Sequence, residues 1–130
     1  YTMAADRQLG SLAHLNNPWQ PSVLSLVKAT CDGARAAGGD PEAFGENANK
    51  PVGVCGEAAG DPGLAVVLVG LGVNSLSMTP RSLPVVAKVL STVTLEQARE
   101  LAGRALAART AEDAVSAVRA GLPILGELGL

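Results

Sequence analysis

Two residues of this 130-residue chain stand out for the chemistry that their side chains could do, Cys55 and Arg7. A thiol is protonated at neutral pH and is still acidic enough to give its proton up. A guanidinium presents a planar fork of N–H donors that matches an oxyanion. Each residue also has an ordinary structural interpretation. A cysteine is most often a small buried apolar residue, and Asp6 beside Arg7 is typical of a solvated salt bridge.

Cys55 ends a segment that is predicted to be a short strand. Residues 51–55 alternate valine with smaller residues, and Gly56 marks the point where the chain must leave the strand. Asp61 and Pro62 then predict a helix start, because an Asp carboxylate accepts hydrogen bonds from the first turn and proline is tolerated there. The thiol is therefore expected at the carboxyl end of a strand, the edge where α/β proteins do their chemistry. Three glycines would permit the turn and a close approach of backbone to substrate: Gly53, Gly56 and Gly60.

The helix that follows is apolar on every side. Residues 62–71 therefore predict a helix that is either buried all round or pressed against another subunit. Gly72 closes the helix, and the segment 73–78 is short enough for a second strand. Strands joined by one packed helix must be parallel. We therefore predict an α/β fold with two parallel strands and about five helices.

Apolar spacing and capping signals predict the other helices. Residues 21–37 form an amphipathic helix with Cys31 on its apolar stripe, where the cysteine is most simply part of the core. Thr94 and Gln97 fit a capping box, and a further helix starts at Thr110, so that residues 94–121 are predicted to be terminal helices.

Three segments carry no predicted core element. Residues 1–20 are interpreted as an irregular loop, with the only histidine, His14, at its surface. Residues 39–50 are polar and rich in Gly, Pro and Asn, which predicts an exposed insertion. The apolar tail 122–130 has no periodicity and no functional interpretation.

Composition argues against several classes of function. A net charge of -2 and single Trp, Tyr and Phe residues argue against nucleic-acid binding. The longest apolar run has 11 residues, whereas a membrane span needs about 20. Cys31 and Cys55 lack disulfide or metal spacing and no secretory signal is seen, so we expect a cytoplasmic protein. Because the chain begins with Tyr1, we expect residues 1–130 to be one partial domain excised from a longer protein.

Two motifs in order resemble the phosphoenolpyruvate-utilising enzymes. Val-Gly-Val-Cys-Gly-Glu-Ala-Ala-Gly-Asp-Pro, residues 52–62, resembles their cysteine loop. Tyr-Thr-Met-Ala-Ala-Asp-Arg, residues 1–7, resembles the segment after the metal-binding strand in enzyme I of the sugar phosphotransferase system. Residues 17–24 and 75–80 are similar to the same family, so the resemblance extends to about Leu106.

The resemblance implies a C-terminal fragment of a TIM-type (β/α)8 barrel, made of its last two strand units and its terminal helices. It implies that Cys55 is the general acid that protonates enolpyruvate, and that Arg7 binds the phosphate or carboxylate of phosphoenolpyruvate. Gly53 and Gly56 would be loop glycines near that substrate. Phosphoryl transfer needs positive charge more than covalent chemistry.

The family also implies a cofactor and partners. Mg²⁺ would be held by a Glu and an Asp that lie outside this fragment, so no metal ligand is expected here, and Glu57 is given no metal role. The phosphoryl group would pass to a histidine of another domain, not to His14, and on to the phosphocarrier protein HPr during sugar uptake. A second copy of the chain is a further expected partner.

Two other functions stay open. The fragment could be a non-catalytic dimerisation or interaction module, or it could be a relative of pyruvate phosphate dikinase and phosphoenolpyruvate synthase, which share the Cys-Gly-Glu loop. The Ala-Ala-Asp-Arg run argues against the second. We further expect the isolated piece to be inactive and to associate with itself, because the rest of a barrel would cover the apolar faces of the helix at 62–71.

Overall fold

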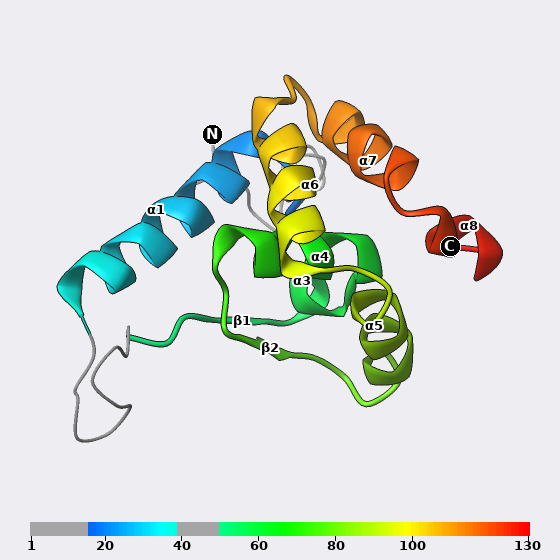
Figure 1. Ribbon diagram of the computed structural model, residues 1–130, viewed down its shortest axis with the longest axis horizontal. Helices are drawn as coiled ribbons and strands as arrows, with labels where there is room; N and C mark the ends of the chain where they lie inside the picture. The colour runs from blue at the N-terminus through cyan, green and yellow to red at the C-terminus, as the bar shows by residue number, and fades with distance from the viewer. Residues whose placement is uncertain (1–15, 39–49) are drawn as a thin grey trace.

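The structure is a computed structural model that describes residues 16–38 and 50–130. Arg7, His14 and all but the last residue of the predicted insertion at 39–50 lie outside the described residues. Within them the chain forms seven helices and two strands, whose arrangement is shown in Figure 1. In chain order these are α1 (Pro21–Ala37), β1 (Gly53–Cys55), α3 (Glu57–Gly60), α4 (Pro62–Leu71), β2 (Ser75–Ser77), α5 (Leu83–Leu90), α6 (Leu95–Ala107), α7 (Ala111–Ala120) and α8 (Pro123–Glu127).

The predicted α/β class with two parallel strands is confirmed, and the helix count of about five was low. The two additional helices, α3 and α8, have four and five residues. Neither is long enough to show an apolar period of 3.6 residues, which is the signal that predicts a helix from sequence. The tail therefore has a structural role after all, because Leu122 and Leu125 are buried.

The two strands pair in parallel, with Gly53 opposite Ser75 and Cys55 opposite Ser77. Both are shorter than the predicted segments 51–55 and 73–78. The difference at β2 has a clear cause: the N–H of Val73 donates to the carbonyl of Leu68 at 3.1 Å, so this residue closes α4 instead of starting the strand.

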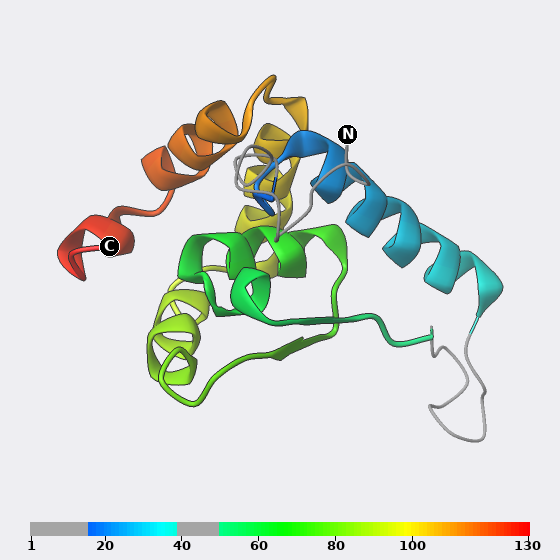
Figure 2. The ribbon, with the colours of Figure 1, turned by 180° about the vertical axis from the view of Figure 1, so that it is seen from behind.

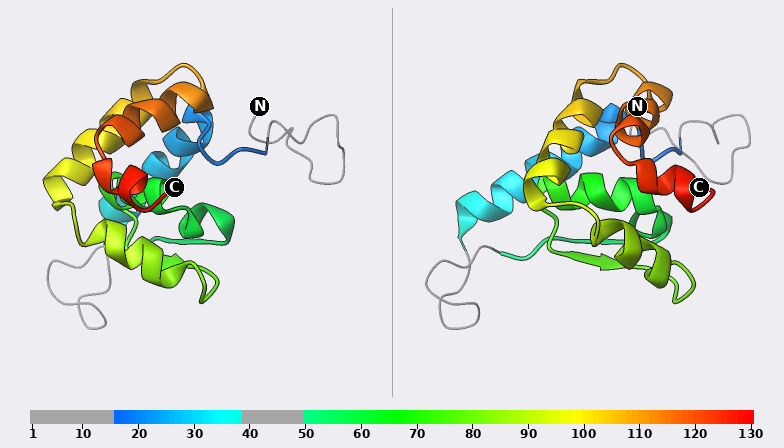
Figure 3. Two further views of the ribbon diagram at one scale, coloured as in Figure 1. Left: turned by 90° about the vertical axis from the view of Figure 1, so that its right-hand side faces the viewer. Right: turned by 45° about the vertical axis from the view of Figure 1, so that its right-hand side comes forward.

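The two faces of this small sheet differ. Val54 and Leu76 are half-buried and pack against the core, whereas their neighbours on both strands, Cys55 and Ser77 among them, are exposed. Successive side chains of a strand point to opposite faces, so the exposed residues share one face. α4 and α6 lie on the other side of the strands, as the views in Figures 1 and 3 show. The sheet thus has one covered face and one open face.

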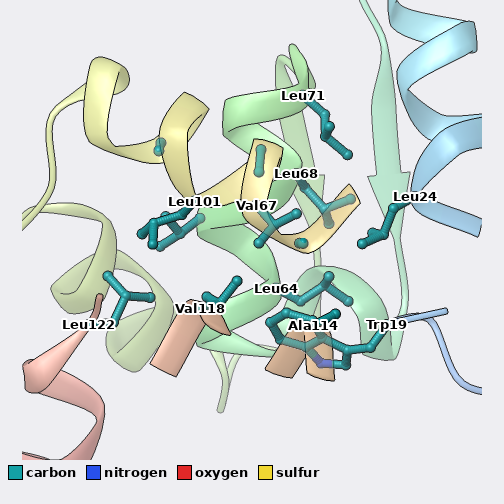
Figure 4. Close-up of a cluster of buried hydrophobic side chains, with 14 of the residues drawn as sticks. Trp19, Leu24, Leu64, Val67, Leu68, Leu71, Leu101, Ala114, Val118 and Leu122 are labelled. Atoms are coloured by element: carbon teal, nitrogen blue, oxygen red, sulfur yellow. The ribbon is translucent and has the colours of Figure 1, made fainter. Parts of the chain in front are cut away.

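The centre of the core is α4, whose residues from Gly63 to Leu68 are all buried. Figure 4 shows Leu64, Val67 and Leu68 among side chains from other elements. These come from α1, α6, α7 and the segment before α1, and include Leu24, Leu101, Val118 and Trp19. Of the two predicted alternatives for this helix, burial by other elements of the same chain is observed for most of its length, and Val69 is half-buried. The described residues therefore cover most of the apolar faces that were expected to need the rest of a barrel or another subunit.

The terminal helices wrap this centre, as seen from behind in Figure 2. The predicted capping box is confirmed at the start of α6. The hydroxyl of Thr94 accepts from the Gln97 N–H at 3.2 Å, and the Gln97 side-chain oxygen accepts from the Thr94 N–H at 2.8 Å. Thr110 caps α7 by accepting from the Asp113 N–H at 3.1 Å. None of the helices in residues 16–38 and 50–130 is long and apolar enough to cross a membrane.

Candidate functional site

Cys55 is the last residue of β1, and its thiol is exposed and free. It lies on the open face of the sheet, at the carboxyl end of the strands. A cysteine that served only as a small apolar residue would be buried, as Cys31 is. The structure therefore leaves the thiol available for chemistry.

The turn after Cys55 depends on Gly56, which has φ +84°. Residues with a Cβ rarely adopt this conformation, so glycine is needed here for the chain to leave the strand. The Gly56 N–H donates to the carbonyl of Ser77 at 3.0 Å, which ties the turn to the end of β2. α3 begins at the next residue. The thiol is thus presented at a sharp strand-to-helix turn that is fixed to both strands.

Gly53 lies within β1, and its predicted place near substrate stays a prediction. A Cβ at this position would lie 2.8 Å from the hydroxyl oxygen of Ser75, its partner on β2. The glycine therefore makes room for a neighbour in the sheet, on the same open face. The short distance also indicates that side chains at paired positions of β1 and β2 would lie next to each other on this face.

Asp61 fixes the far end of the cysteine loop. One carboxylate oxygen accepts from the N–H groups of Gly63 and Leu64, at 2.9 and 3.0 Å, which confirms the predicted helix cap. The other oxygen accepts from the indole N–H of Trp19 at 2.9 Å. Trp19 is only 7% exposed. A single carboxylate thus joins the start of α4 to the segment that precedes α1, and no sequence pattern indicated this second bond.

A hollow of about 470 Å³ lies at the carboxyl ends of the strands, beside the cysteine loop. Its lining combines the turn after β1, α3 and the start of α4 with the segment after β2: Gly56, Glu57, Gly60, Asp61, Pro62, Met78, Thr79 and Ser82. The hydroxyls of Thr79 and Ser82 are 3.3 Å apart. The two loops that the sequence placed after two successive strands therefore form one rim.

Ser77 is a further candidate for this site that was missed from sequence. It is the direct partner of Cys55 across the two strands, and both residues are exposed. The signal was present in Ser75-Leu76-Ser77, where hydroxyls alternate with an apolar residue at the period of a strand. That alternation places Ser77 on the face opposite the half-buried Leu76, which is the face of the thiol.

The second cysteine has the structural role that was predicted. Cys31 is 3% exposed and lies on the apolar side of α1. Burial raises the pKa of its thiol, with a further contribution from the charge of Asp32. Its thiol is therefore more firmly protonated than usual and is poorly placed for acid or nucleophilic chemistry.

The structure describes neither Arg7 nor His14, so their predicted roles stay predictions. In residues 16–38 and 50–130 no group of three or more His, Cys, Asp and Glu side chains is placed to hold a metal ion.

Comparison with known proteins agrees with the resemblance. Residues 1–95 match the family of PEP-utilising enzymes, in its PEP-binding domain. A phosphoenolpyruvate-protein phosphotransferase of Streptomyces coelicolor is 48% identical over 122 residues, which are 94% of this chain and 20% of that protein. The protein of the same name from Haemophilus influenzae is 37% identical over 113 residues, or 87% of this chain and 18% of that protein. A multiphosphoryl transfer protein of Xanthomonas campestris is 41% identical over 123 residues, or 93% of this chain and 13% of that protein.

The chain therefore spans about a fifth or less of the length of these curated relatives. The family match covers most of the chain and includes both motifs, the cysteine loop and the segment around Arg7. By this match, the chain belongs to the PEP-utilising enzymes, as part of their PEP-binding domain.

Proposed function

We propose that this chain is the C-terminal part of the barrel of a phosphoenolpyruvate-protein phosphotransferase, and that Cys55 is its general acid. The observation that carries the proposal is the position of the thiol. Within a chain that matches the PEP-binding domain, it is exposed at the carboxyl end of β1, on the face that α4 leaves open. In a (β/α)8 barrel the helices cover the outer face of the strands and the reaction takes place at their carboxyl ends.

The chemistry requires an acid at this place. When the phosphoryl group leaves phosphoenolpyruvate, the P–O bond breaks and its electron pair stays on the enol oxygen. Enolpyruvate becomes pyruvate only when its terminal carbon takes a proton. In the proposal the S–H bond of Cys55 supplies that proton, and a thiolate remains on the protein.

Arg7 is proposed to bind the phosphate or carboxylate of the substrate. The support is its place in the matched Ala-Ala-Asp-Arg run, within the residues that match the family. Replacing Arg7 with Lys keeps the charge and removes the bidentate fork, so affinity for phosphoenolpyruvate should still fall. An unchanged affinity of Arg7→Lys would identify Arg7 as an ordinary surface cation.

Mg²⁺, HPr and a second copy of the chain complete the proposal. Mg²⁺ would be held by residues outside the described part of this chain and would neutralise charge on the phosphoryl group. HPr would receive the phosphoryl group through a histidine of another domain. A cytoplasmic location accords with the free thiols of both cysteines. Self-association has a different basis from the one expected from sequence. It relies on exposed leucines such as Leu26 and Leu83 and on the short strands, whose edges lack a further partner in the described part of the chain.

The test uses the full-length protein with phosphoenolpyruvate labelled at phosphorus, Mg²⁺ and HPr. We expect label on HPr and one pyruvate per phosphoryl group transferred. A parallel mixture replaces HPr with AMP and either phosphate or pyrophosphate, and transfer of the label to AMP there would instead favour a relative of phosphoenolpyruvate synthase or pyruvate phosphate dikinase. The isolated 130-residue chain should release no pyruvate, and sedimentation should show a dimer or larger species. Inactivity of the full-length protein would favour the remaining alternative, an interaction module.

A further inference from the structure

The open face of the sheet places a hydroxyl directly beside the thiol. Cys55 and Ser77 are paired positions of two parallel strands, and both are exposed. Adjacent strands are about 4.8 Å apart, and side chains at paired positions leave the sheet on the same side. Two pairs earlier, on the same face, the hydroxyl of Ser75 leans over Gly53, to within 2.8 Å of where a Cβ would be. A serine of β2 can therefore reach across to its partner on β1.

The proposed reaction gives this hydroxyl a task. After Cys55 has protonated enolpyruvate, a thiolate is left next to the product, and it must be stabilised until water returns the proton. We propose that Ser77 is a positioning residue whose hydroxyl donates a hydrogen bond to the Cys55 sulfur when the thiolate forms. This inference rests on the proposed function for its purpose, although the contact itself can be tested without catalysis.

Other groups near the rim are less well placed for this task. The hydroxyls of Thr79 and Ser82 are paired with each other at 3.3 Å. Ser75 is opposite Gly53, two residues before the thiol. The side-chain hydroxyl of Ser77 forms no hydrogen bond within residues 16–38 and 50–130. The strand register places Ser77 at the position paired with Cys55, and in the proposal a change of rotamer about its Cα–Cβ bond brings the hydroxyl to the sulfur. Its main-chain carbonyl is already used by the Gly56 N–H, and a side-chain substitution leaves that bond intact.

The first experiment measures alkylation of Cys55 by iodoacetamide across pH in the full-length protein. Trypsin leaves Cys55 and Cys31 on different peptides, because Arg35 lies between them, so mass spectrometry reads each thiol separately. The variants are Ser77→Ala, Ser77→Thr, which keeps a hydroxyl, and Ser75→Ala, a matched control on the same face.

A thiolate that loses a hydrogen bond forms less readily and attacks faster once formed. We take the loss of the hydrogen bond to reduce ionisation of the thiol about fivefold. The nucleophilicity of the thiolate rises by about the square root of that factor, which is about twofold. The alkylation rate therefore falls where little thiolate is present and rises where the thiol is fully ionised. Ser77→Ala should therefore slow alkylation of Cys55 about twofold at pH 7 and speed it about twofold near pH 10.5. Ser77→Thr and Ser75→Ala should follow the unaltered protein throughout.

Three results would overturn the inference. They are an unchanged profile for Ser77→Ala, an equal change for Ser75→Ala, and a change of the same sign at both ends of the pH range, which would indicate altered access.

The second experiment follows exchange of the pyruvate methyl protons into deuterated water, a step that needs the thiolate. Ser77→Ala should slow this exchange severalfold while phosphoenolpyruvate binding is unchanged. If alkylation crosses over as expected and no exchange occurs in the unaltered protein, then the proposed function fails while the contact stands. Normal exchange in Ser77→Ala would refute the purpose assigned to Ser77.

Discussion

Gly70 is the position where a single methyl group should do the most damage to this fold. It lies in α4, where that helix crosses α6. A Cβ at residue 70 would overlap the carbonyl oxygen of Ala98 and would be 2.9 Å from the Cβ of Ala102. The obstacle is helix backbone, which has no alternative rotamer. The two helices would have to move apart by about 1 Å to accept the Gly70→Ala substitution.

The expected cost follows from two opposing effects. Overpacking a close-packed core costs about 1–3 kcal/mol, and an immovable carbonyl puts this site at the upper end. Alanine is favoured over glycine inside a helix by about 1 kcal/mol, which offsets part of that cost. We therefore expect Gly70→Ala to lower the free energy of unfolding by about 2 kcal/mol. In a chain of this size the midpoint of thermal unfolding should fall by about 8 °C.

Urea unfolding of the 130-residue chain, followed by the fluorescence of Trp19, measures this loss. Trp19 is the single tryptophan and is buried against the start of α4, so its emission reports on the core. Gly103→Ala is the matched control, because residue 103 is exposed on α6 and an added Cβ meets nothing within 4 Å. It should raise stability by up to about 1 kcal/mol. If both substitutions stabilise the chain equally, the close crossing of α4 and α6 is wrong.

The remaining predictions concern the cap of α4 and the two thiols. Asp61→Ala should lower the free energy of unfolding by about 2–4 kcal/mol, because it removes the cap and leaves the indole N–H of Trp19 without its acceptor. Thr110→Ala removes only an exposed cap and should lower it by about 1 kcal/mol. Equal losses in urea unfolding would refute the double role of Asp61. Burial raises the pKa of Cys31 in the folded state above its ordinary value of 9.0, so the stability linked to its bound proton is present below about pH 9 and is lost as pH rises further. Cys31→Ala should make the free energy of unfolding fall less steeply above pH 9. Identical slopes of that free energy against pH in the two proteins would contradict this prediction. In the native chain, iodoacetamide should modify Cys55 at least tenfold faster than Cys31, and similar rates would show that α1 does not bury its cysteine.

The sequence predicted those parts of the fold that rest on local chemistry. The cap at Asp61, the end of α4 at Gly72 and the capping box at Thr94 are decided within four residues, and all three are observed. Whether the apolar helix α4 is covered by its own chain or by a partner depends on how α6 and α1 fold over it, which no local pattern contains. The sequence left that alternative open, and the packing of the described residues favours cover by the same chain.

The features of the candidate site that follow one another in sequence were predictable, and the contacts between residues far apart in sequence were not. The thiol, the turn at Gly56 and the helix start follow one another in sequence, so their order could be read directly. The bond from Trp19 to Asp61 joins residues 42 positions apart, and the pairing of Cys55 with Ser77 depends on the register of two strands. A register shift of one residue would place Ser77 on the buried face. Such relations appear only when the elements are placed in space.

The most direct test of the proposed chemistry compares Cys55→Ala with Cys31→Ala in the full-length protein supplied with phosphoenolpyruvate, Mg²⁺ and HPr. If Cys55 is the general acid, its loss should slow pyruvate formation at least about 100-fold, since general acids contribute about 10² to 10⁴ in rate. The dissociation constant of phosphoenolpyruvate should stay within a few-fold, because the thiol acts only as the proton is transferred. Cys31→Ala should form pyruvate at nearly the unaltered rate. Pyruvate formation by Cys55→Ala at the rate of the unaltered protein would contradict the role proposed for this thiol.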